Sequence, residues 1–312
     1  MSRRGTLKAL LKTTLPSPLR RRVAAAARSL RSRKVTSLAE LDVELAKVEQ
    51  AFAVSDAAGR EAFDGFYLEL REPLPKDPGS KEYADAVFAL YRRVAGRAYS
   101  PTNEASDFDL ASAKSSPFPY QTGSAVVVGE QLIAQGFLIK TMNLPTGAKV
   151  LEFGPGWGNT TLQFVQLGYR VTAVEIEARF IELIRHRCAG YTPTLVQSDM
   201  LSFETSERFD AVVFFESFHH CADHRRLLRQ VKHLLAPGGV LVLASEPVGD
   251  FPQPWGIRLD GQSLWAMRRH GWLELGFDSA YLLGHLEEEG WKVTRTTEPA
   301  LGSMADVIIA RV

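Results

Sequence analysis

The chain has 312 residues, of which 45% are hydrophobic and 23% are charged, and its formal net charge is +1. This apolar share is enough for a large core, so the composition excludes a disordered chain, and two cysteines are too few for a disulfide scaffold. Cys188 and Cys221 lack metal-ligand spacing, which favours a reducing compartment, and we expect a cytoplasmic protein.

Residues 1–35 are predicted to form a basic amphipathic arm. Positions 1–34 hold eleven Lys or Arg and no acidic residue, which leaves 26 basic against 36 acidic residues, about −10, in the rest of the chain. Leucine and valine recur at helical spacing, interrupted by Pro16 and Pro18, so we expect two short helices that would lie well on the anionic inner face of a membrane. The alternatives are a solvated arm without a partner and a nucleic-acid or transit-peptide segment. The arm has no aromatic residue to stack on bases, and no apolar run in the chain approaches spanning length.

Residues 36–116 are predicted to form a helical N-terminal region. Apolar residues repeat with heptad-like spacing from Leu38 to Phe52, over barely two heptads, which favours packing onto the same domain over a coiled coil. Two further helices are expected over 61–70 and 81–99, on either side of a loop with three prolines. We expect this region to cover one side of the domain that follows.

A glycine-dense turn follows an apolar strand predicted over 149–153. Gly154, Gly156 and Gly158 stand at alternate positions, where a missing Cβ lets the backbone turn sharply and approach a ligand closely. The polar residues at 159–161, Asn-Thr-Thr, are expected to cap the next helix.

Acidic residues follow the next two predicted strands. The strand over 169–174 ends on Glu175, where a carboxylate in a βαβ unit accepts hydrogen bonds from the two hydroxyls of a ribose. Glu175 therefore predicts a ligand that contains a nucleoside. A third strand over 194–197 is followed by Asp199 and Met200.

The glycine turn departs from the pattern that binds dinucleotides. Counted from Gly154, the sixth position of a G-x-G-x-x-G motif is Asn159, and the charged Glu152 precedes the first glycine by two residues. Neither suits a pyrophosphate.

The order E-x-G-x-G-x-G, Glu175 and Asp199 resembles the class I S-adenosylmethionine-dependent methyltransferases, over about residues 117–312. The resemblance implies an α/β fold with a seven-stranded, mostly parallel sheet, helices on both faces and a closing antiparallel hairpin, here preceded by the helical N-terminal region. It implies S-adenosylmethionine as the cofactor, whose ammonium and sulfonium groups, with no phosphate, suit a carboxylate at Glu152. It also implies that Asp199 accepts from the adenine amino group and that Met200 packs on the ring.

The resemblance also gives a role to the segment before the glycine turn. Residues 117–123 combine two prolines with two aromatic residues, which makes a stiff loop ahead of a helix expected over 124–142. In the family such a loop often closes over the methionine part of the cofactor, so Tyr120 is a candidate cofactor contact, with packing as the alternative.

The most reactive stretch follows the fourth predicted strand, 208–215, whose carboxyl end is where open parallel sheets bind ligands. A hydroxyl acceptor must be held in line and lose its proton, so His219 or His220 is the candidate base, with Glu216 as a further catalytic candidate. These three also resemble the Glu-x-x-Glu-His of quinone-pathway O-methyltransferases, which would orient the acceptor through a divalent metal. The second Glu is replaced by His219, which disfavours a hard cation, and we assign no metal ligand. A histidine that only shapes the loop is the alternative.

A turn at 236–239 precedes the fifth predicted strand, 240–245, and Glu246 at its end is a secondary acid or base candidate. The insert 247–277 is too long for a simple connection, and aromatic faces with cationic donors suit a sugar, a phosphorylated sugar or an aromatic acceptor, or form a lid. Its aromatic and basic residues are Trp255, Trp265, Trp272, Arg258, Arg268, Arg269 and His270. A last helix and two paired closing strands are expected over 278–289, 291–297 and 305–311.

These features predict methyl transfer from S-adenosylmethionine to a small-molecule or saccharide acceptor, foremost a sugar hydroxyl of a glycan or lipid-linked saccharide. O-methylation of a small aromatic or quinone-like metabolite is the second prediction. Nucleic acid is not expected as a partner, because the catalytic part is acidic overall. Two alternatives from other classes are a nicotinamide-dependent oxidoreductase and a non-catalytic, cofactor-binding scaffold at a membrane.

Overall fold

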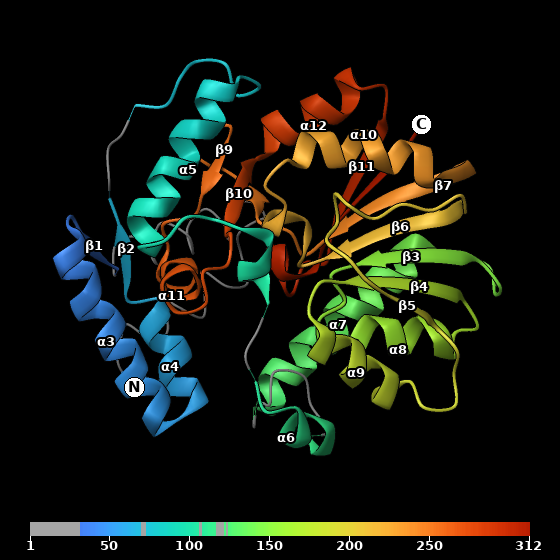
Figure 1. Cartoon of the computed structure of the whole chain (residues 1–312), viewed down its shortest axis with the longest axis horizontal. Helices are drawn as coiled ribbons and strands as arrows, with labels where there is room; N and C mark the ends of the chain where they lie inside the picture. Colours follow the sequence, from blue (N-terminus) through green and yellow to red (C-terminus); the bar gives the residue numbers. More distant parts are fainter. Residues whose placement is uncertain (1–31, 70–72, 106–107, 117–121, 123) are drawn as a thin grey trace, which may run out of the picture. The chain divides into compact units, whose positions relative to one another are not determined.

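Figure 1 shows the computed structural model of the chain, which describes residues 32–69, 73–105, 108–116, 122 and 124–312. Positions 1–31 of the predicted arm and Tyr120 lie outside the described residues. The chain divides into two compact units, a smaller one up to position 71 that includes 259–262 and a larger one of 72–258 and 263–312. The boundary predicted between 116 and 117 falls inside the larger unit, and it stays a prediction.

The smaller unit contains two helices and a two-stranded parallel sheet. Its elements are β1 (Arg33–Val35), α3 (Leu38–Val54), α4 (Asp56–Phe63) and β2 (Phe66–Leu68). The apolar spacing predicted α3 correctly, and Leu41, Leu45 and Val48 are buried on it. The helix predicted over 61–70 is wrong, because the aromatic and leucine residues of β2 favour a strand and pair with β1.

The end of the predicted arm belongs to this folded unit. Arg33–Val35 is a strand rather than part of an amphipathic helix. Arg33 Nη1 lies 2.5 Å from Glu44 Oε1, and Lys34 forms an ion pair with Glu69. Two of the cations counted in the arm are therefore neutralised within the smaller unit.

A seven-stranded sheet organises the larger unit, as predicted. Its strands are β3 (Lys149–Phe153), β4 (Arg170–Glu175), β5 (Thr194–Gln197), β6 (Phe209–Phe215), β7 (Leu235–Ala244), β11 (Lys292–Thr297) and β12 (Asp306–Arg311). Their order is β11-β12-β7-β6-β3-β4-β5, with β12 antiparallel to both of its neighbours and the other pairs parallel. The turn predicted at 236–239 lies within β7, which starts earlier than expected.

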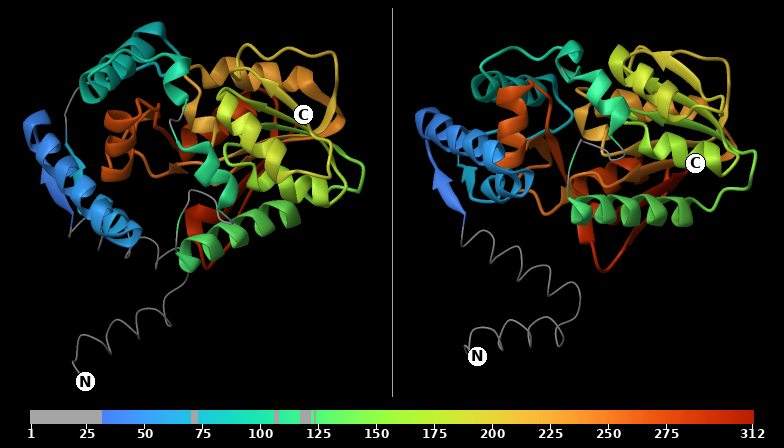
Figure 2. Two further views of the ribbon diagram at one scale, coloured as in Figure 1. Left: turned by 60° about the horizontal axis from the view of Figure 1, so that its bottom comes forward. Right: turned by 90° about the horizontal axis from the view of Figure 1, so that it is seen from below.

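Helices cover both faces of this sheet (Figures 1 and 2). The layer of α7 (Ala125–Met142), α8 (Asn159–Gln166) and α9 (Ala178–Arg187) lies on one face, and α10 (His224–Leu234) and α12 (Ser279–Glu288) lie on the other. The first layer closes an apolar core in which Leu138, Phe164 and Val213 are fully buried. Parallel strands covered on both faces read as continuous apolar runs, which is why β6 was recognisable from the sequence.

The helix α7 is mostly apolar, although it carries Glu130 and Lys140. Among the described residues it is the one helix long and apolar enough to cross a membrane by length and composition, so the expectation that no apolar run approaches spanning length is wrong. Val126, Leu132 and Ile133 are exposed on it, whereas Leu138 and Met142 are buried in the core.

The insert forms a small sheet of its own that packs with α5 (Lys81–Ala95). Its strands β8 (Val248–Gly249), β9 (Trp255–Ile257) and β10 (Leu275–Asp278) lie in the order β8-β10-β9, and α11 (Gly261–Arg269) lies between β9 and β10 in the chain. Trp255 is buried. Its Nε1 donates to Pro78 O at 2.8 Å, and its carbonyl accepts from the Tyr83 hydroxyl at 2.7 Å. The helix predicted over 81–99 ends at Ala95, because Gly96 takes a left-handed φ of 72°.

Candidate functional site

The glycine turn after β3 has the conformation that its residues predicted. Gly154, Gly156 and Gly158 have φ values of 63°, 48° and 72°, in the region that side chains with a Cβ disfavour. A Cβ on Gly154 would lie 2.7 Å from Ser217 Cβ, and one on Gly158 would lie 2.6 Å from Ile184 Cγ1. A Cβ on Gly156 would meet no described atom within 4 Å. The first and third glycines are thus required by packing, and the middle one borders open space.

Glu152 is buried under this turn. Its Oε2 accepts from the Thr161 hydroxyl at 2.6 Å and its Oε1 from the Thr160 hydroxyl, and the residue is 1% exposed. Burial raises the pKa of Glu152 to about 7, against these two hydrogen bonds. The capping role predicted for residues 159–161 is wrong, because α8 begins after Gly158 without a side-chain cap and the threonine hydroxyls serve Glu152 instead.

Glu175 ends β4 next to the same turn. Its Oε2 accepts from Gly156 N at 3.0 Å and its Oε1 from Glu177 N at 3.1 Å. Burial raises the pKa of Glu175, although these backbone donors favour the ionised form. The carboxylate is therefore fixed against the turn, and its contact with a ribose stays a prediction.

Asp199 and Met200 lie past the end of β5. Asp199 Oδ1 accepts from Leu201 N and Ser202 N at 2.9 and 3.0 Å, which fixes the loop. Met200 Cε lies 3.3 Å from the position of a Cβ on Gly154. The structure therefore brings Met200 onto the glycine turn, as its predicted cofactor contact requires.

One carboxylate, Glu246, holds the loop after β6 in place. Glu246 Oε1 accepts from Ser217 N and Phe218 N at 2.8 and 2.9 Å, and Oε2 accepts from His219 N at 3.2 Å. The same Oε2 lies 2.7 Å from His219 Nδ1. Burial raises the pKa of Glu246 to about 7, against the bonds from these backbone donors. From the sequence, Glu246 is a secondary acid or base candidate. In the structure its carboxylate orients His219 and the loop that carries it.

The two candidate histidines lie together with ring centroids 4.1 Å apart. His219 is buried, and its Nε2 lies 3.8 Å from Glu274 Oε2. His220 is partly exposed, with Nδ1 2.8 Å from Leu273 O and 3.2 Å from Glu104 Oε2. Burial lowers the pKa of His220, but nearby carboxylates, led by Glu104, outweigh it and raise the pKa to about 9.

Glu216 differs from the histidines in its surroundings. It has a φ of 51°, and its Oε2 accepts from Gln131 Nε2 of α7 at 3.3 Å. Among the described residues, the one group of three metal-ligand side chains consists of His219, His220 and Glu274, whose ligand atoms lie within 4.8 Å of one another. The structure thus places Glu274, rather than Glu216, with the histidines.

Two acidic residues of this site were missed in the sequence. Glu274 lies in the insert and Glu104 ends a 3-10 turn, Pro101–Glu104, where neither carries a recognisable motif. Glu104 Oε1 accepts from Leu273 N at 2.9 Å, and this hydrogen bond joins the two segments across 169 positions of the chain. Arg258 was a candidate for contact with the acceptor. In the structure it forms an internal ion pair, with its Nη2 2.6 Å from Glu274 Oε2.

An aromatic surface lies beside His220. Trp272 packs edge-on to it with centroids 6.2 Å apart, and His270 stacks on Trp272 at 4.4 Å. Trp272 is partly exposed, and its buried Nε1 has no hydrogen-bond partner among the described residues. Trp272 is therefore the insert tryptophan placed to meet a molecule bound at the histidines.

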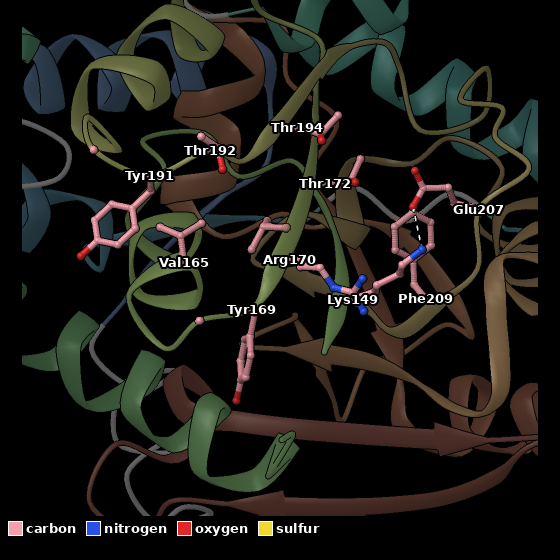
Figure 3. A pocket seen from close by; sticks show the side chains of 13 residues that line it. Lys149, Val165, Tyr169, Arg170, Thr172, Tyr191, Thr192, Thr194, Glu207 and Phe209 are labelled. Carbon is pink, nitrogen blue, oxygen red and sulfur yellow. Dashed lines mark hydrogen bonds and ion pairs between the residues drawn. The ribbon is translucent and has the colours of Figure 1, made fainter. Parts of the chain in front are cut away.

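A separate pocket of about 610 Å³ opens at the opposite edge of the sheet (Figure 3). It is lined by the amino ends of β3, β4 and β5, where Lys149, Arg170 and Thr194 project. Lys149 Nζ pairs with Glu207 Oε2 at 3.3 Å. Parallel sheets bind ligands at their carboxyl ends, so we place the functional site at the glycine turn and the histidine loop.

Comparison with known proteins gives a domain family for the middle of the chain. Residues 151–243 match the family described as a methyltransferase domain. The chain is 32% identical over 105 residues to a ubiquinone biosynthesis O-methyltransferase of Caulobacter sp. (strain K31), covering 32% of this chain and 41% of that protein. It is 30% identical over 116 residues to an uncharacterized methyltransferase of Geobacillus kaustophilus, covering 36% and 54%. The chain therefore spans about half the length of the curated relatives it matches.

Solved structures also resemble the fold. The N-methyltransferase NodS from Bradyrhizobium japonicum, in complex with S-adenosylhomocysteine, aligns with a TM-score of 0.44 and 17% identity over 64% of this chain and 94% of its own. The glycopeptide N-methyltransferase MtfA, in complex with S-adenosylmethionine, aligns with a TM-score of 0.43 and 23% identity over 58% of this chain and 92% of its own.

Proposed function

Because residues 151–243 form a class I S-adenosylmethionine-dependent methyltransferase domain, we propose that the chain transfers a methyl group to a hydroxyl oxygen of a small acceptor. S-adenosylmethionine is the cofactor of this domain, and when bound it supplies the methyl group. The acceptor class that we put first is a sugar hydroxyl, as in a glycan or a lipid-linked saccharide.

The residues at the glycine turn fit this cofactor. Open space borders Gly156, which would let the backbone meet the ligand. Glu175 would hold the ribose hydroxyls, and Met200, on the turn, would pack on the adenine. Asp199 keeps Oδ2 for the adenine amino group while Oδ1 fixes the loop. Glu152 would act through its negative field on the methionine end when it is ionised, because its carboxylate is buried under the turn.

The observation that carries the proposal is the 2.7 Å contact between His219 Nδ1 and Glu246 Oε2. A carboxylate that accepts from Nδ1–H leaves the lone pair on Nε2, which can take the proton of an acceptor hydroxyl, and it stabilises the imidazolium that results. Glu246 also binds the backbone of the histidine loop, so ring and loop are positioned together. His219 is therefore our proposed base, and Glu246 a positioning residue.

Trp272 supports a ring-shaped acceptor. Its partly exposed ring lies beside His220. An aromatic face suits the apolar side of a sugar ring. The same face suits an aromatic ring, and the ubiquinone biosynthesis O-methyltransferase relatives favour a small aromatic or quinone-like acceptor as the second candidate.

The test is formation of S-adenosylhomocysteine by the full chain with two acceptor panels, alkyl glycosides or lipid-linked saccharides and substituted catechols. A sugar methyl ether identified by mass spectrometry supports the first class, and a methylated catechol supports the second. Tight cofactor binding without turnover on either panel contradicts the proposal and favours the scaffold alternative. Sedimentation with anionic liposomes, with and without residues 1–31, separately tests the proposed contact with the anionic inner face of a membrane and leaves β1 in place.

A further inference from the structure

We propose that His219, His220 and Glu274 form a binding site for a divalent metal ion of the zinc type. One ligand atom from each side chain lies within 4.8 Å of the others. Two of these residues follow β6 and the third belongs to the insert, so the site exists only in the folded larger unit. Two imidazoles and one carboxylate are a recurrent ligand set for zinc and neighbouring transition metals.

Both imidazoles have the ring orientation that metal ligands need. Nδ1 of His220 lies 2.8 Å from Leu273 O, and a carbonyl oxygen only accepts, so Nδ1 carries the proton. Nδ1 of His219 lies 2.7 Å from Glu246 Oε2. Metal-ligating histidines almost always donate the other ring N–H to a carboxylate or a backbone carbonyl. With Nδ1 donating, each ring can offer Nε2 to a metal ion, which takes the place of any proton held there.

The spacing of the ligand atoms suits one ion. Zinc lies roughly 2.0 to 2.2 Å from nitrogen and carboxylate ligands, so two ligands on one ion lie at most about 4 Å apart. His219 Nε2 and Glu274 Oε2 are 3.8 Å apart, and the other separations need to close by less than about 1 Å. Arg258 Nη2 occupies one lone pair of Glu274 Oε2, which fixes the carboxylate and leaves the second lone pair and Oε1 for a metal.

The charge of the surroundings favours a cation. Glu104 Oε2 lies 3.2 Å from His220 Nδ1, and Glu246 faces His219. With Glu274 these make three carboxyl groups around two imidazoles, and Arg258 is the cation paired with Glu274. Buried charges are costly unless they are paired, and a divalent ion that takes the place of a proton on His220 would pair with these carboxyl groups.

The proposed site differs from the one that the sequence suggested. Glu216, the first residue of that motif, accepts from Gln131 and is outside the cluster. Imidazole ligands favour zinc, nickel or cobalt over magnesium or calcium, which prefer an all-oxygen shell. Glu216 and Glu274 are thus a matched pair of glutamates, and only one of them is expected to matter for the metal.

Metal binding and the proposed base role make opposite demands on His219. An Nε2 that ligates a metal has no lone pair left for a proton, so the base role applies to the metal-free protein. The metal site does not depend on the proposed function, because its ligands can be titrated without cofactor or acceptor.

The test is calorimetric titration of the metal-free full chain with Zn²⁺, supported by the visible absorption of Co²⁺ bound in its place. We expect one ion per chain, Co²⁺ bands typical of four or five ligands, and no heat with Mg²⁺. Glu274→Gln and His220→Gln are each expected to weaken Zn²⁺ binding by at least about 10- to 100-fold, and Glu216→Gln to leave it unchanged. Circular dichroism of each variant checks that it folds.

A Zn²⁺ affinity that is the same in Glu274→Gln and in the unaltered chain, or no saturable binding at all, overturns the site. Loss of binding in Glu216→Gln with retention in Glu274→Gln overturns it in favour of the motif from the sequence. S-adenosylmethionine binding, measured in parallel on the same samples, reports on the methyltransferase proposal alone. Failure of one proposal is thus distinguishable from failure of the other.

Discussion

Gly156→Ala tests directly where the cofactor lies. Gly156 has a φ of 48°, and an alanine there takes a left-handed backbone at a cost of about 1–2 kcal/mol. Its Cβ meets no described atom within 4 Å, so no steric cost is added to the free energy of unfolding. The same Cβ projects into the space proposed for the cofactor. We therefore expect cofactor affinity to fall at least about tenfold, or 1.4 kcal/mol, beyond the loss of stability.

The matched control is Gly238→Ala. Gly238 has a φ of 78° in β7 and open space around its missing Cβ, so the backbone cost is similar, but it lies far along β7 from the carboxyl ends of the strands. Thermal unfolding should show similar shifts for the two variants, and calorimetry with S-adenosylhomocysteine should show weaker binding only for Gly156→Ala. Equal affinities in both variants would refute the placement of the cofactor against this turn.

Three other substitutions test the buried polar groups of the larger unit. Burial lowers the pKa of His224 from about 6.5 to about 3, so between these values the unfolded chain binds a proton that the folded one excludes, and the contribution of His224 to stability falls by about 2 kcal/mol from pH 7 to pH 5. Urea unfolding of His224→Phe should lose this part of the pH dependence, and an unchanged slope contradicts it. Burial raises the pKa of Glu152 to about 7, so the folded chain holds an extra proton between about pH 4.5 and 7, and the contribution of Glu152 to stability falls by up to about 3 kcal/mol as pH rises through this window. Glu152→Gln should remove this contribution, leave that of Glu246, whose pKa is also raised to about 7, and weaken cofactor binding; a pH dependence identical to that of the unaltered chain would contradict the assignment to Glu152. Glu246→Gln removes a charged acceptor from His219 and three backbone donors, so we expect about 10- to 100-fold lower kcat with little change in KM for the cofactor, and an unchanged kcat in an S-adenosylhomocysteine release assay would exclude the His219 base.

Local patterns in the sequence determined the architecture of the larger unit. The apolar run over 209–215, the glycine spacing after 153 and the paired closing strands each depend on residues a few positions apart, and such short-range patterns set helices, strands and turns. The seven-stranded, mostly parallel sheet and its antiparallel end followed from the family resemblance, and the structure agrees with both.

Side-chain partners over long separations were decided only by the tertiary structure. Thr160 and Thr161 look like helix caps in the sequence, but the folded turn brings their hydroxyls onto Glu152. Glu104 and Glu274 have no local signature, yet packing of the insert brings them to the two histidines. Neighbouring residues can predict a strand or a turn because backbone geometry is local, whereas the charge and ligands of a site depend on which distant segments the closed core places side by side.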